Sequence, residues 1–324
     1  MAMSDSPFHA DELDAQARAG RGASGAGIRN FMPDQHRDFF ELLPYLFVAT
    51  RDADGWPLAT MLTGTPGFVY ASDSVTLRVD ALPDGRDPVA ATLGEGREVG
   101  ILGLDLATRR RNRANGQIAG VDDGGFTVAV RQSFGNCAKY IQRRVVHRVP
   151  PAPGRVDAFD ALDAEARTLI GRADTLFVAS RSRAEIGAAG GLDVSHRGGR
   201  PGFVHVEGDT LAIPDFAGNR YYNTLGNLLG EPRAALLFVD FETGDLLQLQ
   251  GRATIDWRAD AAALVDGAER RWRFAVERGW RSRAATALRW SFVDYSPATL
   301  GTGTWDLSIP AAIQANEVIP EERP

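Results

Sequence analysis

The tetrapeptide Pro66-Gly67-Phe68-Val69 occurs a second time as Pro201-Gly202-Phe203-Val204, 135 residues further along the chain. Upstream of it, the segment LFVAT at 46–50 returns as LFVAS at 176–180. Self-similarity at a nearly constant spacing is typical of a duplicated structural unit. The sequence therefore predicts two successive copies of one fold.

Each copy combines a helical pattern with several short, strand-like segments. The helical patterns lie at 33–44 and 156–173. Apolar and β-branched residues predict strands at 45–50, 58–63, 67–71, 75–79, 98–104, 110–117 and 126–130, and in the second copy at 175–180, 193–196, 202–206, 210–213, 233–240, 245–257 and 288–295. Too few helices remain for the crossovers of a parallel sheet. We therefore expect a mainly β fold with a few helices, built as two antiparallel barrels in tandem.

Composition limits the classes of function. The chain has 324 residues and 44% hydrophobic content, enough for two cores, and its net charge of −6 argues against nucleic-acid or anionic-membrane partners. The single cysteine, Cys137, excludes an internal disulfide, and the five histidines show no metal-ligand spacing, so no metal site is expected. There is no signal-peptide pattern and no run of about 20 apolar residues, so a soluble, cytoplasmic protein is expected.

The proline-rich segment PPAPG at 150–154 lies between the copies and is typical of a linker. The predicted organisation is an N-terminal arm at 1–30, a first repeat at 31–149, the linker at 150–155, a second repeat at 156–310 and a loose tail at 311–324.

Two motifs of the second copy suit an anion. DVSHRGG at 193–199 predicts a strand that ends in a glycine turn. It places the hydroxyl of Ser195, the imidazole of His196 and the guanidinium of Arg197 close together. PDFAGNR at 214–220 precedes a predicted helix, whose first N–H groups also favour an anion. Surface turns with solvated arginines are the alternative. The repeat favours a binding site, because Arg197 lies opposite Leu62, and Arg220 lies opposite the Pro83-Asp84 neighbourhood, with Arg86 close by. We therefore expect one phosphate site, in the second half.

The run from Ser195 to Ala253, with its PGFV, IPD, GNR and late G-R motifs, resembles the pyridoxamine 5′-phosphate oxidase-like, FMN-binding split-barrel family. The resemblance covers most of 170–257, and RRRNRANG at 109–116 and RQSFGNCAKYIQRR at 131–144 resemble first-half motifs of two-copy members. It implies two tandem split β-barrels that form a pseudo-dimer, with FMN in the groove between them.

The resemblance also implies roles for individual residues. Ser195, Arg197, Asn219 and Arg220 would hold the phosphate; Asp193, Val194, Pro214, Asp215, Asn223 and Thr224 would line the ribityl chain or ring, and Gln248 would add a polar contact. Lys139 and Tyr140 are candidates for contacts across the groove. His196 is the candidate catalytic proton carrier, or alternatively a phosphate donor, because histidine titrates near neutrality.

One face of the strand predicted at 110–117 carries Arg111, Arg113 and Asn115, because side chains two residues apart in a strand point the same way. We expect them to face the groove or the other barrel. Cys137 could approach the flavin, although a small buried thiol is the simpler interpretation.

The expected function is that of an FMN-dependent oxidoreductase, which acts on a small organic substrate or oxygen and takes electrons from a reductase or NAD(P)H. The alternatives are a non-catalytic protein that binds or stores flavin or haem, and a protein that uses a deazaflavin. A second copy of the chain, as a homodimer, is a further candidate partner.

Overall fold

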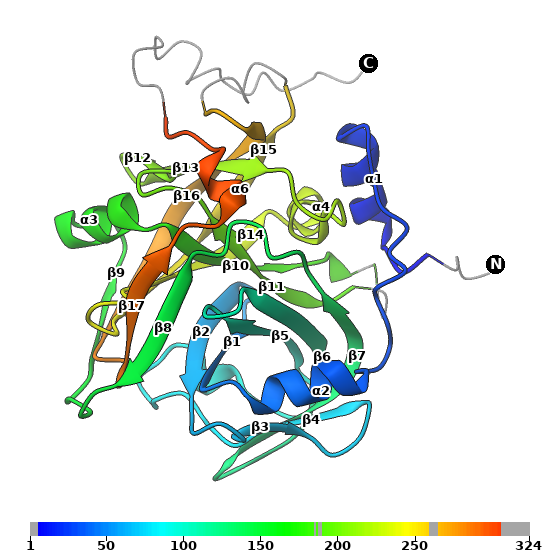
Figure 1. Ribbon diagram of the computed structural model, residues 1–324, viewed down its shortest axis with the longest axis vertical. Coiled ribbons are helices and arrows are strands. Elements are labelled where there is room, and N and C mark those ends of the chain that lie inside the picture. The colour runs from blue at the N-terminus through cyan, green and yellow to red at the C-terminus, as the bar shows by residue number, and fades with distance from the viewer. Residues whose placement is uncertain (1–5, 185, 187–189, 259–264, 306–324) are drawn as a thin grey trace.

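The computed structural model describes residues 6–184, 186, 190–258 and 265–305. These residues form two large antiparallel sheets, one of seven and one of eight strands, together with a two-stranded sheet and a few short helices (Figure 1). The prediction of a mainly β fold is confirmed. No helix in this part of the chain has both the length and the hydropathy that crossing a bilayer requires.

The first repeat contains two helical segments and eight strands among its described residues. They are α2 (Asp34–Glu41), β1 (Tyr45–Arg51), β2 (Pro57–Thr63), β3 (Val69–Ala71), β4 (Thr76–Val79), the 3₁₀ helix η1 (Ala90–Thr92), β5 (Glu98–Asp105), β6 (Arg110–Asp122), β7 (Gly125–Gly135) and β8 (Arg143–Arg148). Those of the second are β9 (Arg155–Phe159), α3 (Ala164–Arg172), β10 (Thr175–Arg181), β11 (Leu192–Gly198), β12 (His205–Glu207), β13 (Thr210–Phe216), α4 (Asn223–Gly230), β14 (Arg233–Val239), β15 (Leu246–Asp256), β16 (Ala268–Arg283), β17 (Leu288–Asp294) and α6 (Pro297–Leu300).

The two large sheets have the same strand order. The first runs β2-β1-β5-β6-β7-β4-β3 and the second runs β11-β10-β14-β15-β16-β13-β12. Counted from β1 in the first repeat and from β10 in the second, both orders are second, first, fifth, sixth, seventh, fourth and third; the eighth strand of the second sheet, β9, pairs with β16 outside this order. The repeat found in the sequence is therefore a repeat of topology. The small sheet joins the two halves, because β8 pairs with β17.

The sequence did not predict the longest strand, β16, which lies between β15 and β13. Its inward residues Trp272 and Phe274 are fully buried, but arginine or glutamate occupies many positions around them, and this charge hides the alternation. Two other expectations were wrong. β9 begins at Arg155, within the predicted linker, and it occupies the first part of the helix expected at 156–173, so that α3 is shorter.

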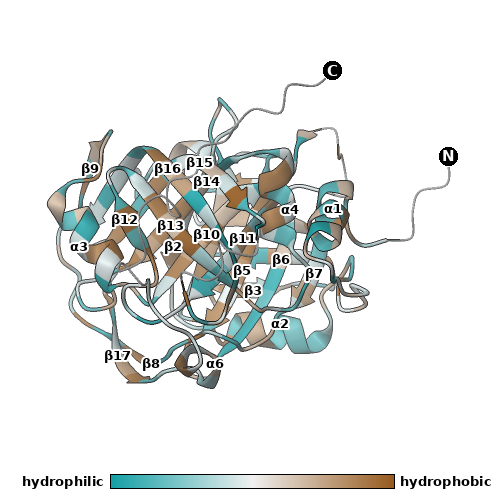
Figure 2. Cartoon of the chain, turned by 90° about the horizontal axis from the view of Figure 1, so that it is seen from above, coloured by the Kyte–Doolittle hydropathy of each residue, from teal (hydrophilic) through white to brown (hydrophobic). Residues whose placement is uncertain are grey.

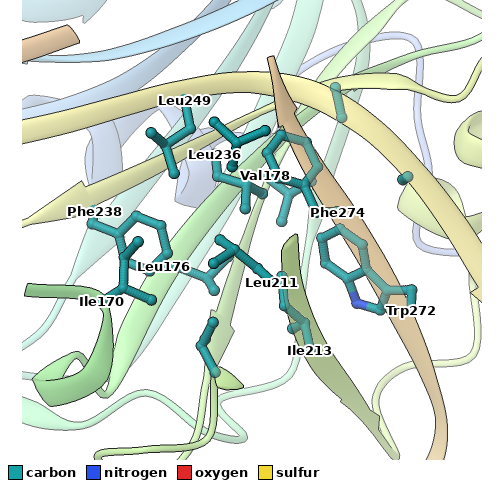
Figure 3. Packing of buried hydrophobic residues seen from close by; sticks show 14 of the residues in the cluster. Ile170, Leu176, Val178, Leu211, Ile213, Leu236, Phe238, Leu249, Trp272 and Phe274 are labelled. Atoms are coloured by element: carbon teal, nitrogen blue, oxygen red, sulfur yellow. The ribbon is translucent and has the colours of Figure 1, made fainter. Parts of the chain in front are cut away.

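Three apolar clusters stabilise the fold. One lies inside each repeat, and Figure 3 shows that of the second, where Trp272 and Phe274 pack against Leu176 and Val178. The third lies between the repeats. Here the equivalent residues Phe47 and Phe177 stack with ring centroids 3.6 Å apart. Contact between equivalent residues is the mark of a two-fold interface, so the repeats form a pseudo-dimer. Coloured by hydropathy, the strands of this interior are largely apolar (Figure 2).

The N-terminal arm packs on the second repeat, although it precedes the first in the chain. Its helix α1 (Ala10–Arg18) lies against α4 (Figure 1), and Ala15 belongs to the core of the second repeat. Gly226 of α4 permits this approach, since a Cβ there would lie 2.6 Å from the Cα of Glu12. The arm is thus an ordered cover over 6–30. Residues 306–324, which include the predicted tail, lie outside the described residues.

Candidate functional site

A cleft opens where the two repeats meet, and the space between its walls, open solvent included, is about 810 Å³. Ten of the predicted site residues line it: Lys139, Ser195, His196, Arg197, Pro214, Asp215, Asn219, Arg220, Asn223 and Thr224. They come from the segment after β7, from β11 and β13, and from the loop that leads into α4. Because β11 is the edge strand of its sheet, residues from both of its faces reach the cleft.

Three predicted residues do not line this cleft. Asp193 lies in a smaller neighbouring pocket. Val194 is fully buried in the apolar cluster between the repeats. Gln248 is also buried, and its Nε2 donates to the carbonyl of Ala59 at 2.9 Å and to Asp87 Oδ1 at 3.2 Å. The structure therefore gives Val194 a packing role and Gln248 an inter-repeat role.

The cleft is positively charged in an acidic protein. Five cationic side chains line it, namely Arg111, Arg113, Lys139, Arg197 and Arg220, against the two carboxylates Asp215 and Glu269. Arg111 and Arg113 come from β6 of the first repeat, so both repeats supply positive charge to the cleft. The expectation that these two arginines face the groove is confirmed. The cleft suits an anionic ligand.

The arginines of the second repeat differ in how far their charge is compensated. Arg197 Nη1 lies 2.5 Å from Asp215 Oδ1, and Arg270 pairs with the other oxygen of the same carboxylate. Arg220 is exposed, has a left-handed backbone with φ of 63°, and makes no ion pair with the described residues. Arg220 therefore has its full charge available for a ligand.

The two arginines of the first repeat are enclosed by protein. Arg111 Nη1 donates to His196 Nδ1 at 3.2 Å, and loss of solvent lowers the pKa of Arg111 to about 10. Arg113 Nη1 donates to Asn223 Oδ1 at 3.2 Å. Burial lowers the pKa of Arg113 as well, although the nearby Asp193 opposes the shift. An anion in the cleft would compensate both buried charges.

His196 is a neutral hydrogen-bond donor at ordinary pH. It is 4% exposed, and burial together with Arg111 and Arg197 holds its pKa well below the usual value. Since Arg111 can only donate, Nδ1 accepts and the proton sits on Nε2. His196 Nε2 is buried and has no partner among the described residues. This geometry favours the expected donor role over proton transfer.

Hydroxyl groups and a helix start complete the polar side of the cleft. Ser195 Oγ lies 2.5 Å from Thr224 Oγ1, in the first turn of α4. Tyr222, directly before α4, adopts a left-handed conformation with φ of 59°. The first N–H groups of a helix lack intrahelical partners and favour anions.

An aromatic wall comes from both repeats. Tyr140 and Phe216 have ring centroids 5.3 Å apart, and Tyr140 Oη and Lys139 Nζ donate to the carbonyl of Ala217 at 3.2 and 3.3 Å. Cys137 is half-buried and also lines the cleft, with its Sγ 3.8 Å from an Arg111 nitrogen. Segments far apart in the sequence therefore share one site.

Comparison with known proteins gives only distant likenesses. No family profile and no curated protein matches the chain. HupZ of Group A Streptococcus matches at 17% identity with a TM-score of 0.28, over 37% of this chain and 98% of HupZ.

Two other solved structures match over a similar share of the chain. A pyridoxinephosphate oxidase family protein from Clostridium acetobutylicum, related to general stress protein 26, matches at 14% identity and a TM-score of 0.29, over 40% of this chain and 92% of its own. An FAD-binding protein from Mesorhizobium loti matches at 12% identity with a TM-score of 0.26, over 39% of this chain and 97% of its own. Such TM-scores are too low to assign a ligand or an activity.

Proposed function

We propose that the cleft binds FMN and that the protein is a flavin-dependent oxidoreductase. The observation that carries this proposal is a ring of unsatisfied polar atoms around the cleft. Buried atoms without a partner among the described residues include the Nε of Arg111 and Arg197, His196 Nε2 and Asn136 Oδ1. Most of them are donors, and leaving a buried donor unpaired costs about 1–3 kcal/mol. A phosphate group carries the charge and the acceptors that these donors lack.

The residues present fit a flavin phosphate with an aromatic ring system attached. Ser195, Arg197, Arg220 and the start of α4 would hold the phosphate, with Asn219, Asn223 and Thr224 beside it. The wall of Tyr140 and Phe216 offers apolar surface to the isoalloxazine ring, next to Pro214. When bound, FMN supplies the redox chemistry.

The chain's own residues would set the conditions for that chemistry. Arg111 and Arg113 supply fixed positive charge, which favours anionic groups in the cleft. His196 holds its proton on Nε2 and can donate a hydrogen bond without a change of charge. The electron donor would be a separate reductase or NAD(P)H, and the acceptor a small organic molecule or oxygen.

The visible spectrum of the purified protein, followed by titration with FMN, tests this proposal. We expect a flavin spectrum and saturation at one FMN per chain, because one cleft carries the positive charge. Saturation at two per chain would contradict the single site, and the absence of flavin binding would contradict the proposal itself. Reduction of the bound flavin by NAD(P)H would support the enzyme, whereas a flavin inert to reductants would support a binding or storage protein.

A further inference from the structure

A second, smaller pocket adjoins the cleft where the N-terminal arm meets both repeats. The space between its walls, open solvent included, is about 280 Å³. His9, at the start of α1, Asn115 of β6 and Asp193 of β11 line it together with the apolar ring of Phe134. Asn223, whose Oδ1 accepts from Arg113 Nη1 at 3.2 Å, lines both this pocket and the cleft.

Two buried oxygens in this pocket lack a partner among the described residues. Asn115 Nδ2 donates to Asp193 Oδ1 at 3.0 Å, and this bond fixes which end of the amide carries the oxygen. Asn115 Oδ1 and Asp193 Oδ2 are then left without a hydrogen bond. The two residues are only 8% and 4% exposed, respectively. A buried carboxylate oxygen without a donor is costly, so a donor from a ligand would be stabilised here.

A third acceptor comes from the N-terminal arm. Asn227 Nδ2 donates to Ser180 Oγ at 3.1 Å, so Asn227 Oδ1 accepts from His9 Nε2 at 2.9 Å. Burial lowers the pKa of His9, which favours the neutral ring. His9 Nδ1 is then an acceptor, and it faces the backbone N–H of Glu12 in the capping box at the start of α1.

The other charged groups nearby already have partners. Glu12 accepts from the backbone N–H of His9 at 2.9 Å and from Asn223 Nδ2 at 2.5 Å. Arg113 Nε lies 3.3 Å from Asp193 Oδ1, and it offsets part of the charge of that carboxylate. Among the described residues of this pocket, two buried oxygens, Asn115 Oδ1 and Asp193 Oδ2, remain without a donor, whereas most of the unpaired buried atoms of the cleft are donors.

We propose that this pocket binds the protonated amino group of a small organic amine. An ammonium group carries N–H donors and no acceptor, which matches the two free oxygens Asp193 Oδ2 and Asn115 Oδ1. A flavin in the cleft would then lie next to an amine substrate. That last step rests on the proposed function, whereas binding of the amine itself does not require a flavin.

Titration of the ¹⁵N-labelled full chain with methylammonium chloride tests this inference, with and without added FMN. We expect saturable shifts of the Asn115 and Asn223 side-chain amide signals at millimolar concentrations, as is typical of a two-atom ligand. Methanol, which has the same size but no charge, and potassium chloride at equal ionic strength serve as controls. Failure of the flavin proposal appears only in the FMN titration, so the two results are separable.

Asp193→Asn keeps the size of the side chain and removes its charge. We expect it to weaken methylammonium binding at least tenfold, whereas Asp160→Asn, which removes an exposed carboxylate, leaves binding unchanged. Equal shifts with potassium chloride or methanol, or no saturable shift of the wild-type signals, would overturn the inference whether or not the variant folds. Unchanged affinity of folded Asp193→Asn would also overturn it.

Discussion

The second repeat keeps an open, positively charged cleft, whereas the first repeat fills the equivalent position with its own carboxylate. Thr60 of β2 occupies the position of Ser195 of β11, because they pair with the equivalent residues Val48 and Val178. The hydroxyl of Ser195 lies at the cleft. The hydroxyl of Thr60 instead donates to Asp87 Oδ2 at 2.6 Å.

The groups that donate hydrogen bonds to Asp87 are of the same kinds as those that line the cleft. The backbone N–H of Val89, at the start of η1, donates to Asp87 Oδ1 at 2.8 Å, and the amide of Gln248 donates to it at 3.2 Å. Both η1 and α4 lie between the fourth and fifth strands of their repeats. By strand register, Gln248 is the counterpart of Arg113. A hydroxyl, a helix start and a side chain from the opposite repeat thus surround an anion in the first repeat.

The difference shows that the same strand positions can form an open cleft in one repeat and a filled site in the other. Leu62 and Gln248 stand where the cleft has Arg197 and Arg113, so the filled site in the first repeat lacks these two positive charges. A resident carboxylate now satisfies the remaining donors. Burial raises the pKa of Asp87, and hydrogen bonds from Thr60 and others partly offset that shift. By this comparison the ligand phosphate belongs next to Ser195, as the Asp87 carboxylate lies next to Thr60.

The largest expected effect is on flavin affinity. Arg197→Ala and Arg220→Ala should each weaken FMN binding by about 1.5–3 kcal/mol, the usual scale for a hydrogen bond to a charged group. Arg86→Ala is the matched control, because Arg86 is exposed near the closed site and pairs with Asp84. Fluorescence titration of the three variants measures the effect. Wild-type affinity in both cleft variants would show that the phosphate binds elsewhere.

The closed site around Asp87 in the first repeat should affect the stability of the fold, whereas the open cleft in the second repeat should affect FMN binding. Thr60→Val removes a hydrogen bond to a buried carboxylate and should lower the free energy of unfolding by about 1.5–3 kcal/mol, whereas Ser195→Ala removes a neutral bond to Thr224 and should cost about 0.5–1.5 kcal/mol. Only Ser195→Ala should weaken FMN binding. Urea unfolding and FMN titration check the two effects, and a loss of FMN affinity in Thr60→Val would break the comparison.

The smallest effect concerns Glu12, the buried carboxylate of the arm beside the open cleft. Burial raises the pKa of Glu12 from 4.5 to about 7, while the hydrogen bond from Asn223 opposes the shift. The folded protein therefore holds this proton more tightly than the unfolded chain. The resulting stability is complete below the unfolded pKa and is lost as the pH rises through the folded pKa.

Glu12→Gln removes this titration and serves as the reference. Relative to Glu12→Gln, the free energy of unfolding of the wild type should fall by about 1–2 kcal/mol between pH 5 and pH 7. Asp87 and other titrating groups remote from Glu12 are common to both proteins and cancel in the difference. Urea unfolding at the two pH values measures it, and parallel pH profiles would show that Glu12 titrates normally.

Most strands and most cleft residues could be predicted from the sequence, because the signals are local. The segments around Phe47 and Phe177 are short, continuous apolar runs that predict buried strands, and the glycine turn after Arg197 follows its strand directly. β16 could not be predicted in the same way, because charged residues occupy many positions within it. Its place in the sheet is evident only from the neighbouring strands β13 and β15, with which it pairs, and from the burial of Trp272 and Phe274.

The sequence by itself determined that the fold is duplicated and that a hydroxyl, an imidazole and a guanidinium follow one another at 195–197. Only the tertiary structure decided that Arg111 and Arg113 join them, that Gln248 serves the closed site, and that the arm covers α4. The physical reason is that the residue pattern that predicts a strand or a turn is local, since it involves only residues close together in the sequence. Charge compensation and burial depend instead on which distant strands meet when the two repeats pack together.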